Sequence, residues 1–218
     1  IKLFIRIFMS DYSDKLDLFL FPLISDFKEP NILEFGVENG TSTLKFLEIC
    51  NKNNGYLFSA DVVDCSNVSN DPRWLFMCSR DDNYNFIKSK IPKKLDIIYL
   101  DSVHESSHVE KIFYNYFEML KVNGYFFIDD ISNLPYLKNK KRNNFFNEIN
   151  NKETLNKIVE IFNSNSDLFE LNLTYKSSGL AIIKKLSDHS LKKSSKIQTR
   201  EKSFKNFIRL IWKNLKKD

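Results

Sequence analysis

Acidic residues stand where two apolar runs of the sequence end. Asp101 follows residues 95–100, and Asp129 and Asp130 follow residues 125–128. If both runs are strands of one parallel sheet, their carboxyl ends bring these three carboxylates to the same edge. Carboxylates this close repel one another unless a hard cation joins them, and Mg²⁺ prefers oxygen ligands. We therefore expect Asp101, Asp129 and Asp130 to bind Mg²⁺, with the alternative that Asp130 caps the following segment and no metal binds.

A histidine, His104, comes three residues after Asp101. A neutral imidazole titrates near neutral pH and can take a proton from an alcohol while the alcohol oxygen attacks an electrophile. A bound metal would lower the pKa of that hydroxyl and share the work. His104 and Asp101 are thus the candidate catalytic residues. The alternative is a loop histidine that hydrogen-bonds a substrate or the backbone without proton transfer.

A second group of residues has the spacing of a strand, a tight glycine turn and a helix. A short apolar run reaches Glu34, Gly36 and Gly40 follow with three residues between them, and Thr41 and Ser42 come next. Gly36 allows backbone angles that other residues avoid, and Gly40 lets the backbone pass close to a ligand. Hydroxyl side chains favour the start of a helix. A helix N-terminus over a strand end suits a nucleotide-like ligand.

The glycine pattern E-x-G-x-x-x-G lacks the middle glycine of the dinucleotide-binding fingerprint. It resembles motif I of the class I S-adenosylmethionine-dependent methyltransferases, and it is most similar to their catechol- and sugar-O-methyltransferase-like members. Asp101 and His104 form a D-x-x-H that resembles the sugar-modifying branch, and Asp129-Asp130 resembles the acidic pair of the metal-dependent O-methyltransferases. The resemblance covers about residues 30–185. It implies S-adenosylmethionine as cofactor and a hydroxyl of a sugar or another small polar molecule as acceptor.

The same resemblance assigns residues to the cofactor. Asp61, which lies 25 residues after Gly36, would accept both ribose hydroxyls, with Asp64 as a nearby alternative. Ser79 and Asp81 resemble the adenine-contacting segment, in which Asp82 is an equal alternative. The expected cofactor-binding set is Glu34, Gly36, Gly40, Ser42, Asp61, Ser79 and Asp81.

These side chains need a sheet that brings strand ends together, and the sequence predicts one. Apolar runs predict strands at residues 31–35, 56–60, 74–78, 95–100 and 125–128, followed by a hairpin of 170–175 and 180–183 around Ser177-Ser178-Gly179. Helices are expected at 11–28, 43–50, 81–90, 109–120 and 143–163. Strands that are almost entirely apolar and alternate with helices predict a parallel sheet covered on both faces. We expect an α/β, Rossmann-like class I methyltransferase fold, with a mostly parallel seven-stranded sheet and a C-terminal antiparallel hairpin.

The chain divides into three expected parts: an N-terminal helical segment at 1–29, a methyltransferase domain at 30–186, and a basic amphipathic tail at 187–218. The segment at 1–8 is apolar but short and lacks a small-residue cleavage site, so we do not expect a signal peptide. Met9 is an alternative start.

The totals favour a reduced globular protein. The chain has 218 residues, 42% of them hydrophobic, which is enough for one α/β domain. Its three cysteines, Cys50, Cys65 and Cys78, have no C-x-x-C spacing, which favours a cytoplasmic location. No apolar run has the length of a membrane span.

Two other functions are open alternatives. His104 and His108 form a formal H-E-x-x-H, the zinc protease motif, but this motif needs to lie inside a helix and here it directly follows an expected strand. A zinc hydrolase is therefore the weakest alternative. The other is a non-catalytic nucleotide-binding or membrane-tethered scaffold. The sequence does not indicate the oligomeric state.

The C-terminal tail concentrates the positive charge. Residues 192–218 hold ten lysines and arginines against Glu201 and Asp218, a net charge of +8, whereas the whole chain carries +5. Apolar residues at 204, 207, 208, 211 and 215 share one face of an expected helix. Such a helix packs on the domain or a neighbouring subunit, or binds an anionic membrane surface. RNA binding is the less expected alternative, because no aromatic-basic sheet motif supports it.

Overall fold

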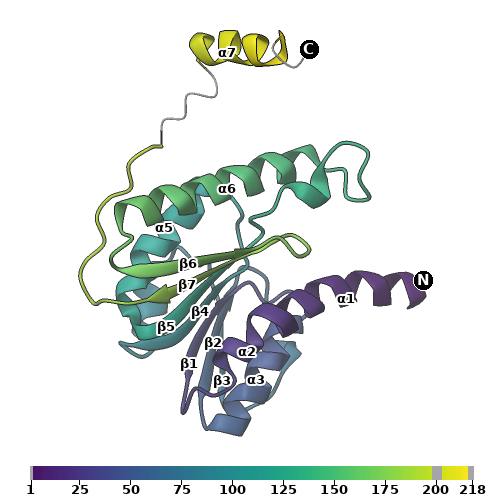
Figure 1. Cartoon of the computed structure of the whole chain (residues 1–218). Helices are drawn as coiled ribbons and strands as arrows, with labels where there is room; N and C mark the ends of the chain where they lie inside the picture. The colour runs from purple at the N-terminus through teal and green to yellow at the C-terminus, as the bar shows by residue number, and fades with distance from the viewer. Residues whose placement is uncertain (1, 198–202, 216–218) are drawn as a thin grey trace.

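The computed structural model describes residues 2–197 and 203–215. Its centre is a seven-stranded sheet in the order β3-β2-β1-β4-β5-β7-β6 (Figure 1). Strands β1 to β5 run parallel, and β7 is antiparallel to its neighbours β5 and β6. The strands are β1 Asn31–Phe35, β2 Tyr56–Asp61, β3 Trp74–Cys78, β4 Leu95–Leu100, β5 Leu120–Asp129, β6 Phe169–Thr174 and β7 Leu180–Lys185. The predicted mostly parallel sheet with an antiparallel C-terminal hairpin is confirmed.

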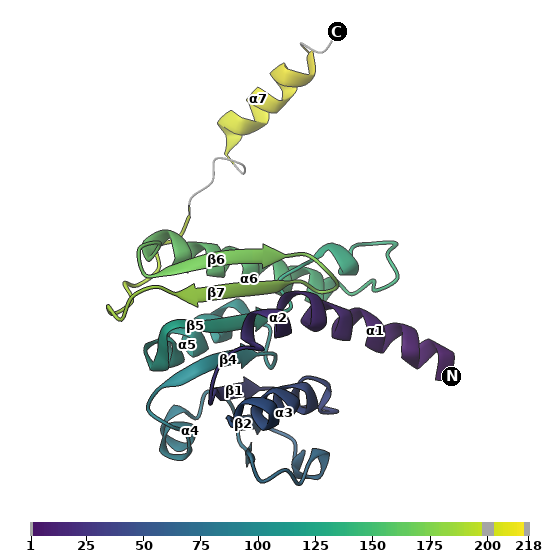
Figure 2. The same ribbon diagram turned by 60° about the horizontal axis from the view of Figure 1, so that its bottom comes forward.

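Helices cover both faces of the sheet (Figure 2). They are α1 Lys2–Phe19, α2 Phe21–Ile24, α3 Thr41–Asn53, α4 Tyr84–Lys90, α5 Ser106–Tyr116, α6 Phe145–Ser164 and α7 Phe204–Leu215. One core lies between the sheet and α1, α2 and α3, where Leu16, Leu20 and Phe46 pack on the strands. The second core lies under α4, α5 and α6, where Phe113 and Ile158 are buried. The strands are apolar on both sides because both sides are covered.

Several element boundaries differ from the sequence-based expectation by a few residues, and two elements differ more. The N-terminal helix expected at 11–28 is interrupted: α1 ends at Phe19, and α2 begins at Phe21 with Pro22 in its first turn. Proline lacks the N–H that a continuous helix needs, but it is well accommodated in a first turn. Strand β5 begins at Leu120 rather than 125. The added residues contain an irregularity, with a positive φ of 65° at Asn123 and a shifted register opposite β4.

The sheet topology creates one edge suited to a ligand. Strands β1 and β4 are neighbours although β2 and β3 come between them in the chain, so the strand order reverses at this point. Ligands of open parallel sheets bind outside the carboxyl ends of the strands at such a reversal. Glu34, Asp61, Asp101 and Asp129 all lie at this edge. The expected division of the chain into parts that end at residues 29 and 186 remains a prediction.

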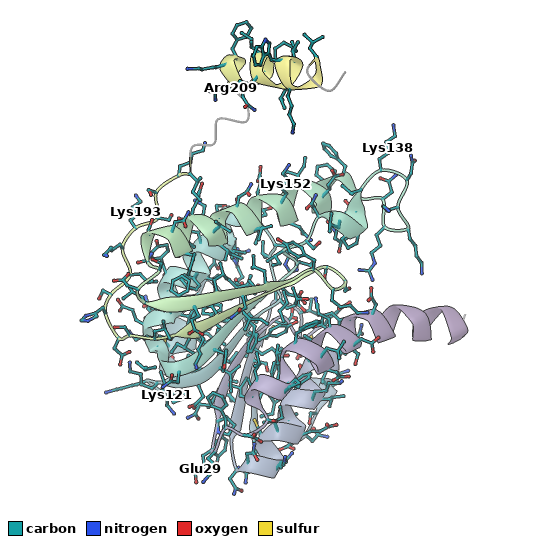
Figure 3. All side chains as sticks on the ribbon, in the orientation of Figure 1. Glu29, Lys121, Lys138, Lys152, Lys193 and Arg209 are labelled. Carbon is teal, nitrogen blue, oxygen red and sulfur yellow. The ribbon has the colours of Figure 1, made fainter. Side chains whose placement is uncertain are left out.

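Helix α7 stands apart from the sheet and its covering helices in Figure 1, and Figure 3 marks Arg209 on it. Its apolar side chains are exposed, including Phe204, Phe207, Ile211 and Leu215. Among the helices that the structure describes, none combines the length and the apolarity that crossing a membrane requires.

Candidate functional site

A cavity of about 1320 Å³ opens at the carboxyl edge of the parallel strands. Its wall combines the turn after β1, the ends of β2 to β5, α1 and the turn between β6 and β7. Most of the residues expected from the sequence line it: Gly36, Ser42, Asp61, Ser79, Asp81, Asp101, His104, Asp129 and Asp130. Glu34 and Gly40 do not. The sequence thus located the cavity, and the two exceptions have a structural explanation.

The glycines of the first turn are required by close backbone packing. Gly36 has a φ of +93°, and a Cβ at this position would overlap the carbonyl oxygen of Asp101. Gly40 has a φ of +77° and directly precedes α3, and a Cβ at this position would overlap the Val68 side chain. Both glycines adopt left-handed backbone angles that side chains disfavour. The turn therefore brings the first residues of α3 to the cavity wall, and Gly36 joins it to the end of β4.

Glu34 lies beneath this turn and does not line the cavity, and its assignment to the cofactor remains a prediction. Its carboxylate accepts hydrogen bonds from Ser42 Oγ at 2.6 Å, Thr43 Oγ1 at 2.8 Å and Ser59 Oγ at 2.7 Å. Full burial raises the pKa of Glu34 to about 7, although the three hydroxyl donors oppose this rise. Glu34 therefore ties the start of α3 to β1 and β2.

Asp61 holds the turn from the end of β2. Its Oδ2 accepts hydrogen bonds from the backbone N–H of Val37 at 2.8 Å and of Glu38 at 3.2 Å, and its Oδ1 accepts one from Val63 at 2.9 Å. Partial burial opposes ionisation, but these backbone donors lower the pKa of Asp61. Asp61 is thus an anionic acceptor on the cavity wall. The alternative, Asp64, bonds the backbone of Ser66 and does not line the cavity.

Asp81 is fixed by a partner that the sequence did not suggest. Its Oδ2 accepts a hydrogen bond from Ser102 Oγ at 2.5 Å and lies 2.8 Å from His108 Nε2. Burial opposes ionisation of Asp81, but His108 and Ser102 lower its pKa. The alternative residue, Asp82, pairs with Arg80 and Lys111 and does not line the cavity.

The two histidines of the H-E-x-x-H motif serve different carboxylates. Helix α5 begins at Ser106, so His104 precedes the helix and only His108 lies on it. His104 Nε2 lies 3.6 Å from both Asp101 Oδ1 and Asp130 Oδ2. Because the zinc motif needs both imidazoles on one helix face, this geometry does not support the zinc hydrolase alternative.

The carboxylates after β4 and β5 form the second half of the cavity, which we call the acid centre: Asp101, Asp129, Asp130 and His104. Burial, followed by the charge of Asp129, raises the pKa of Asp101 to about 7. The same two causes raise the pKa of Asp130. Asp130 also has a left-handed φ of 56°, an uncommon conformation for a residue with a side chain. His104 thus lies between two carboxyl groups that resist losing their protons.

Two tyrosines connect the carboxylates of the acid centre. Tyr12 Oη donates to Asp101 Oδ2 at 2.7 Å and lies 2.8 Å from Tyr99 Oη. Tyr99 Oη is 3.1 Å from Asp101 Oδ2 and 3.0 Å from Asp129 Oδ2. These four oxygen–oxygen contacts share only two hydroxyl protons. A proton on the Asp101 carboxyl group would provide a further hydrogen bond among them. This agrees with the raised pKa of Asp101.

A buried lysine from α1 completes the acid centre. Lys15 is fully buried, and its ammonium forms an ion pair with Asp129 Oδ1. Neither Lys15 nor Tyr12 was expected from the sequence as a site residue. The one signal is that Tyr12, Leu16 and Leu20 follow a four-residue spacing, so the buried stripe of α1 extends one turn towards the N-terminus.

The expected Mg²⁺ site does not form from these side chains. Among the described residues, no group of three or more His, Cys, Asp or Glu side chains is arranged to hold a metal ion. The reason is the direction of Asp129, whose carboxylate is used by Lys15, by Tyr99 and by the backbone N–H of Asp130 at 2.7 Å. The three aspartates are brought together as expected, but their donor set does not fit the cation.

Comparisons with known proteins agree with this architecture. Residues 33–131 match the family described as "Methyltransferase domain". No curated protein sequence matches the chain.

Several solved structures share the fold. MycE, a methyltransferase of the mycinamycin biosynthetic pathway solved with Mg and SAH, aligns with 83% of this chain at a TM-score of 0.58 and 18% identity. This chain spans only 54% of the MycE chain. The SAH-bound methyltransferase PaMTH1 of Podospora anserina aligns over 72% of both chains, with a TM-score of 0.58 and 13% identity. A Staphylococcus aureus protein described as a candidate caffeoyl-CoA O-methyltransferase has a TM-score of 0.57 and 16% identity, covering 82% of this chain and 83% of its own.

Proposed function

We propose that the chain is a class I S-adenosylmethionine-dependent methyltransferase and that it methylates a hydroxyl oxygen of a sugar or another small polar molecule. The observation that carries the proposal is the position of His104, which faces the cavity between Asp101 and Asp130. A group that accepts a proton from an alcohol belongs at this position.

The half of the cavity around the turn after β1, which we call the turn half, fits the cofactor. Gly36, Ser42 and Asp61 line the wall, no side chain caps the first turn of α3, and Asp61 offers an anionic acceptor suited to ribose hydroxyls. Ser79 and Asp81 line the neighbouring wall, where we propose that they contact the adenine. S-adenosylmethionine supplies a sulfonium methyl group that an oxygen nucleophile can attack.

The half of the cavity around the acid centre, which we call the acid half, fits the acceptor. His104 would take the proton of the acceptor hydroxyl, and the carboxyl groups of Asp101 and Asp130 would stabilise the resulting imidazolium. Tyr136, Arg142 and Ser177 add polar groups to this side of the cavity. A wall this rich in hydrogen-bonding groups favours an acceptor with several hydroxyls, as in a sugar. Holding the acceptor oxygen in line with the methyl group would supply much of the rate.

Calorimetric titration with S-adenosylhomocysteine tests the cofactor half, and methyl transfer to a panel of sugars and phenols tests the acceptor half. We expect His104→Ala to lower the rate by about 10² to 10⁴ while the affinity for S-adenosylhomocysteine stays unchanged. Asp64→Ala is the matched control, because Asp64 lies outside the cavity. Tight binding without turnover on any acceptor would favour the scaffold alternative, and no binding would contradict the proposal.

We also propose that α7 gives the enzyme a peripheral contact with an anionic membrane surface. Its apolar side chains are exposed, and Lys205, Arg209 and Lys213 add positive charge. Sedimentation with vesicles of phosphatidylglycerol should capture the full chain, whereas vesicles of phosphatidylcholine alone should not. The double variant Phe207→Asp/Ile211→Asp should lose this binding. Self-association without vesicle binding would instead indicate that α7 packs on a second copy of the chain.

We further propose a reducing location such as the cytoplasm. Cys50 and Cys65 are buried and Cys78 is exposed, and all three are free thiols. Proteins that keep their cysteines unpaired are typical of reducing compartments. Fractionation of cells that express the protein tests this, and recovery from an oxidising compartment would contradict it.

A further inference from the structure

Lys15 uses its whole donor capacity inside the protein. Besides the ion pair with Asp129, its Nζ donates to Ser178 Oγ at 3.0 Å and to the carbonyl oxygen of Gly179 at 3.3 Å. An ammonium group has three donors, and each of them has a partner here. Lys15 therefore joins α1 to the end of β5 and to the turn before β7.

Asp129 is equally occupied. Oδ1 accepts from Lys15 and from the backbone N–H of Asp130, while Oδ2 faces Tyr99 Oη at 3.0 Å. The residue is 1% exposed. A buried carboxylate is stable only with a partner charge and hydrogen bonds, and Lys15 supplies the charge. A divalent cation at Asp129 would have to approach this ammonium group and be repelled by it.

We propose that Lys15 is the resident cation of the acid centre and takes the position at which a divalent metal would otherwise join the carboxylates. The ammonium neutralises Asp129, so Asp101 and Asp130 remain available to His104. Lys15 acts through Asp129 and is a positioning residue. Its consequence for methyl transfer rests on the proposed function, whereas the exclusion of metal does not.

The proposal also gives α1 a part in the site. Tyr12 and Lys15 lie one helical turn apart and reach Asp101 and Asp129 respectively. Docking of a single helix thus delivers both a hydrogen-bond donor and a positive charge to the acid centre. Methyl transfer should therefore require α1 to be docked against the sheet.

Mn²⁺ titration followed by electron paramagnetic resonance tests the proposal on the full chain, without cofactor. Wild type should bind no Mn²⁺ at millimolar concentration, and its methyl transfer should be unchanged by EDTA. Lys15→Met should acquire one Mn²⁺ site that disappears in the double variant Lys15→Met/Asp129→Asn. Lys185→Met is the matched control: Lys185 is also buried, but it donates to the carbonyl oxygens of Phe117 and Leu120 and pairs with Asp188, an exposed carboxylate outside the acid centre, so its loss should create no site.

A single Mn²⁺ bound by wild type and lost in Asp129→Asn would overturn the proposal, and this result does not depend on whether Lys15→Met folds. A folded Lys15→Met that acquires no Mn²⁺ would also contradict it. Titration of the same samples with S-adenosylhomocysteine reports separately on the proposed function. A failure of cofactor binding is thereby distinguished from a failure of the lysine assignment.

Discussion

Two buried carboxylates at the same edge of the sheet are neutralised in different ways. Glu34, in β1, is surrounded by hydroxyl groups whose residues lie within 25 positions of it in the chain, and its pKa is raised to about 7. Asp129, at the end of β5, pairs with the ammonium of Lys15, which is 114 positions away. The turn half of the cavity is thus built by nearby residues and neutral donors. The acid half depends on a charge that arrives only when α1 docks.

The largest effect that distinguishes the two halves is expected from Lys15. Lys15→Met leaves Asp129 buried without its charge partner, which should lower the free energy of unfolding by about 3–5 kcal/mol. Adding Asp129→Asn removes the unpaired charge and should recover part of this loss. Urea unfolding of wild type, both single variants and the double variant measures the coupling.

An exposed ion pair is the control for this cycle. Lys45 and Asp17 also form an ion pair between α3 and α1, but both side chains are partly exposed to water. Lys45→Met should therefore cost less than about 1 kcal/mol. If Lys15→Met costs no more than Lys45→Met, the charge on Asp129 does not depend on α1, and the contrast between the two halves fails.

The sequence predicted the turn half better than the acid half for a physical reason. Gly36 and Ser42 belong to a turn and a helix that directly follow one strand, so their spacing located them, and the family resemblance added Asp61 at the end of the next strand. Asp101, Asp129 and Asp130 were also brought together correctly, because the carboxyl ends of parallel strands share an edge. Which cation the aspartates meet could not be predicted. The answer depends on α1, whose residues Tyr12 and Lys15 lie 89 and 114 positions before the aspartates that they contact.

Glu34 differs from these residues, because it does not line the cavity. Its position at a strand end suggested a ligand contact, yet the side chain points beneath the turn, where three hydroxyls surround it. Sequence spacing gives a residue's place along a strand, but the direction of its side chain depends on packing. In β1 this packing involves Ser59 of the neighbouring strand as well as the first turn of α3.

The next effect concerns the glycine that joins the two halves. Gly36→Ala places a Cβ against the rigid carbonyl of Asp101 at a left-handed φ, so both the turn and the end of β4 must shift. Gly40→Ala has a similar backbone penalty of about 1–2 kcal/mol, but its Cβ meets the tip of the Val68 side chain, which can move. Gly36→Ala should therefore lower stability by more, and it should abolish S-adenosylhomocysteine binding. Equal losses in calorimetry and urea unfolding would mean that the two halves are not joined at Gly36.

The last prediction is a pH dependence of stability that arises at Glu34, in the turn half. Between its ordinary pKa of 4.5 and the raised pKa of about 7, Glu34 is protonated when folded and ionised when unfolded. The folded state then binds more protons, so stability falls as pH rises through this window, by at most about 1.4 kcal/mol per pH unit. Below the window both states hold the proton, and above it neither does.

Glu34→Gln removes this titration, so the stability of wild type relative to the variant should fall between pH 4.5 and about 7 and then level off. Thr43→Val removes one hydroxyl donor that opposes the rise in pKa, so the decline should extend to higher pH. Urea unfolding across this range measures both changes. Asp101 titrates in all three proteins, but its charge also raises the pKa of Glu34, so the differences report the Glu34 titration together with this coupling. If the stability of wild type and of Glu34→Gln varies identically with pH, the three hydroxyl donors stabilise an ionised Glu34. The two buried carboxylates would then both be charged in the folded protein, and neutral donors would serve as well as a lysine.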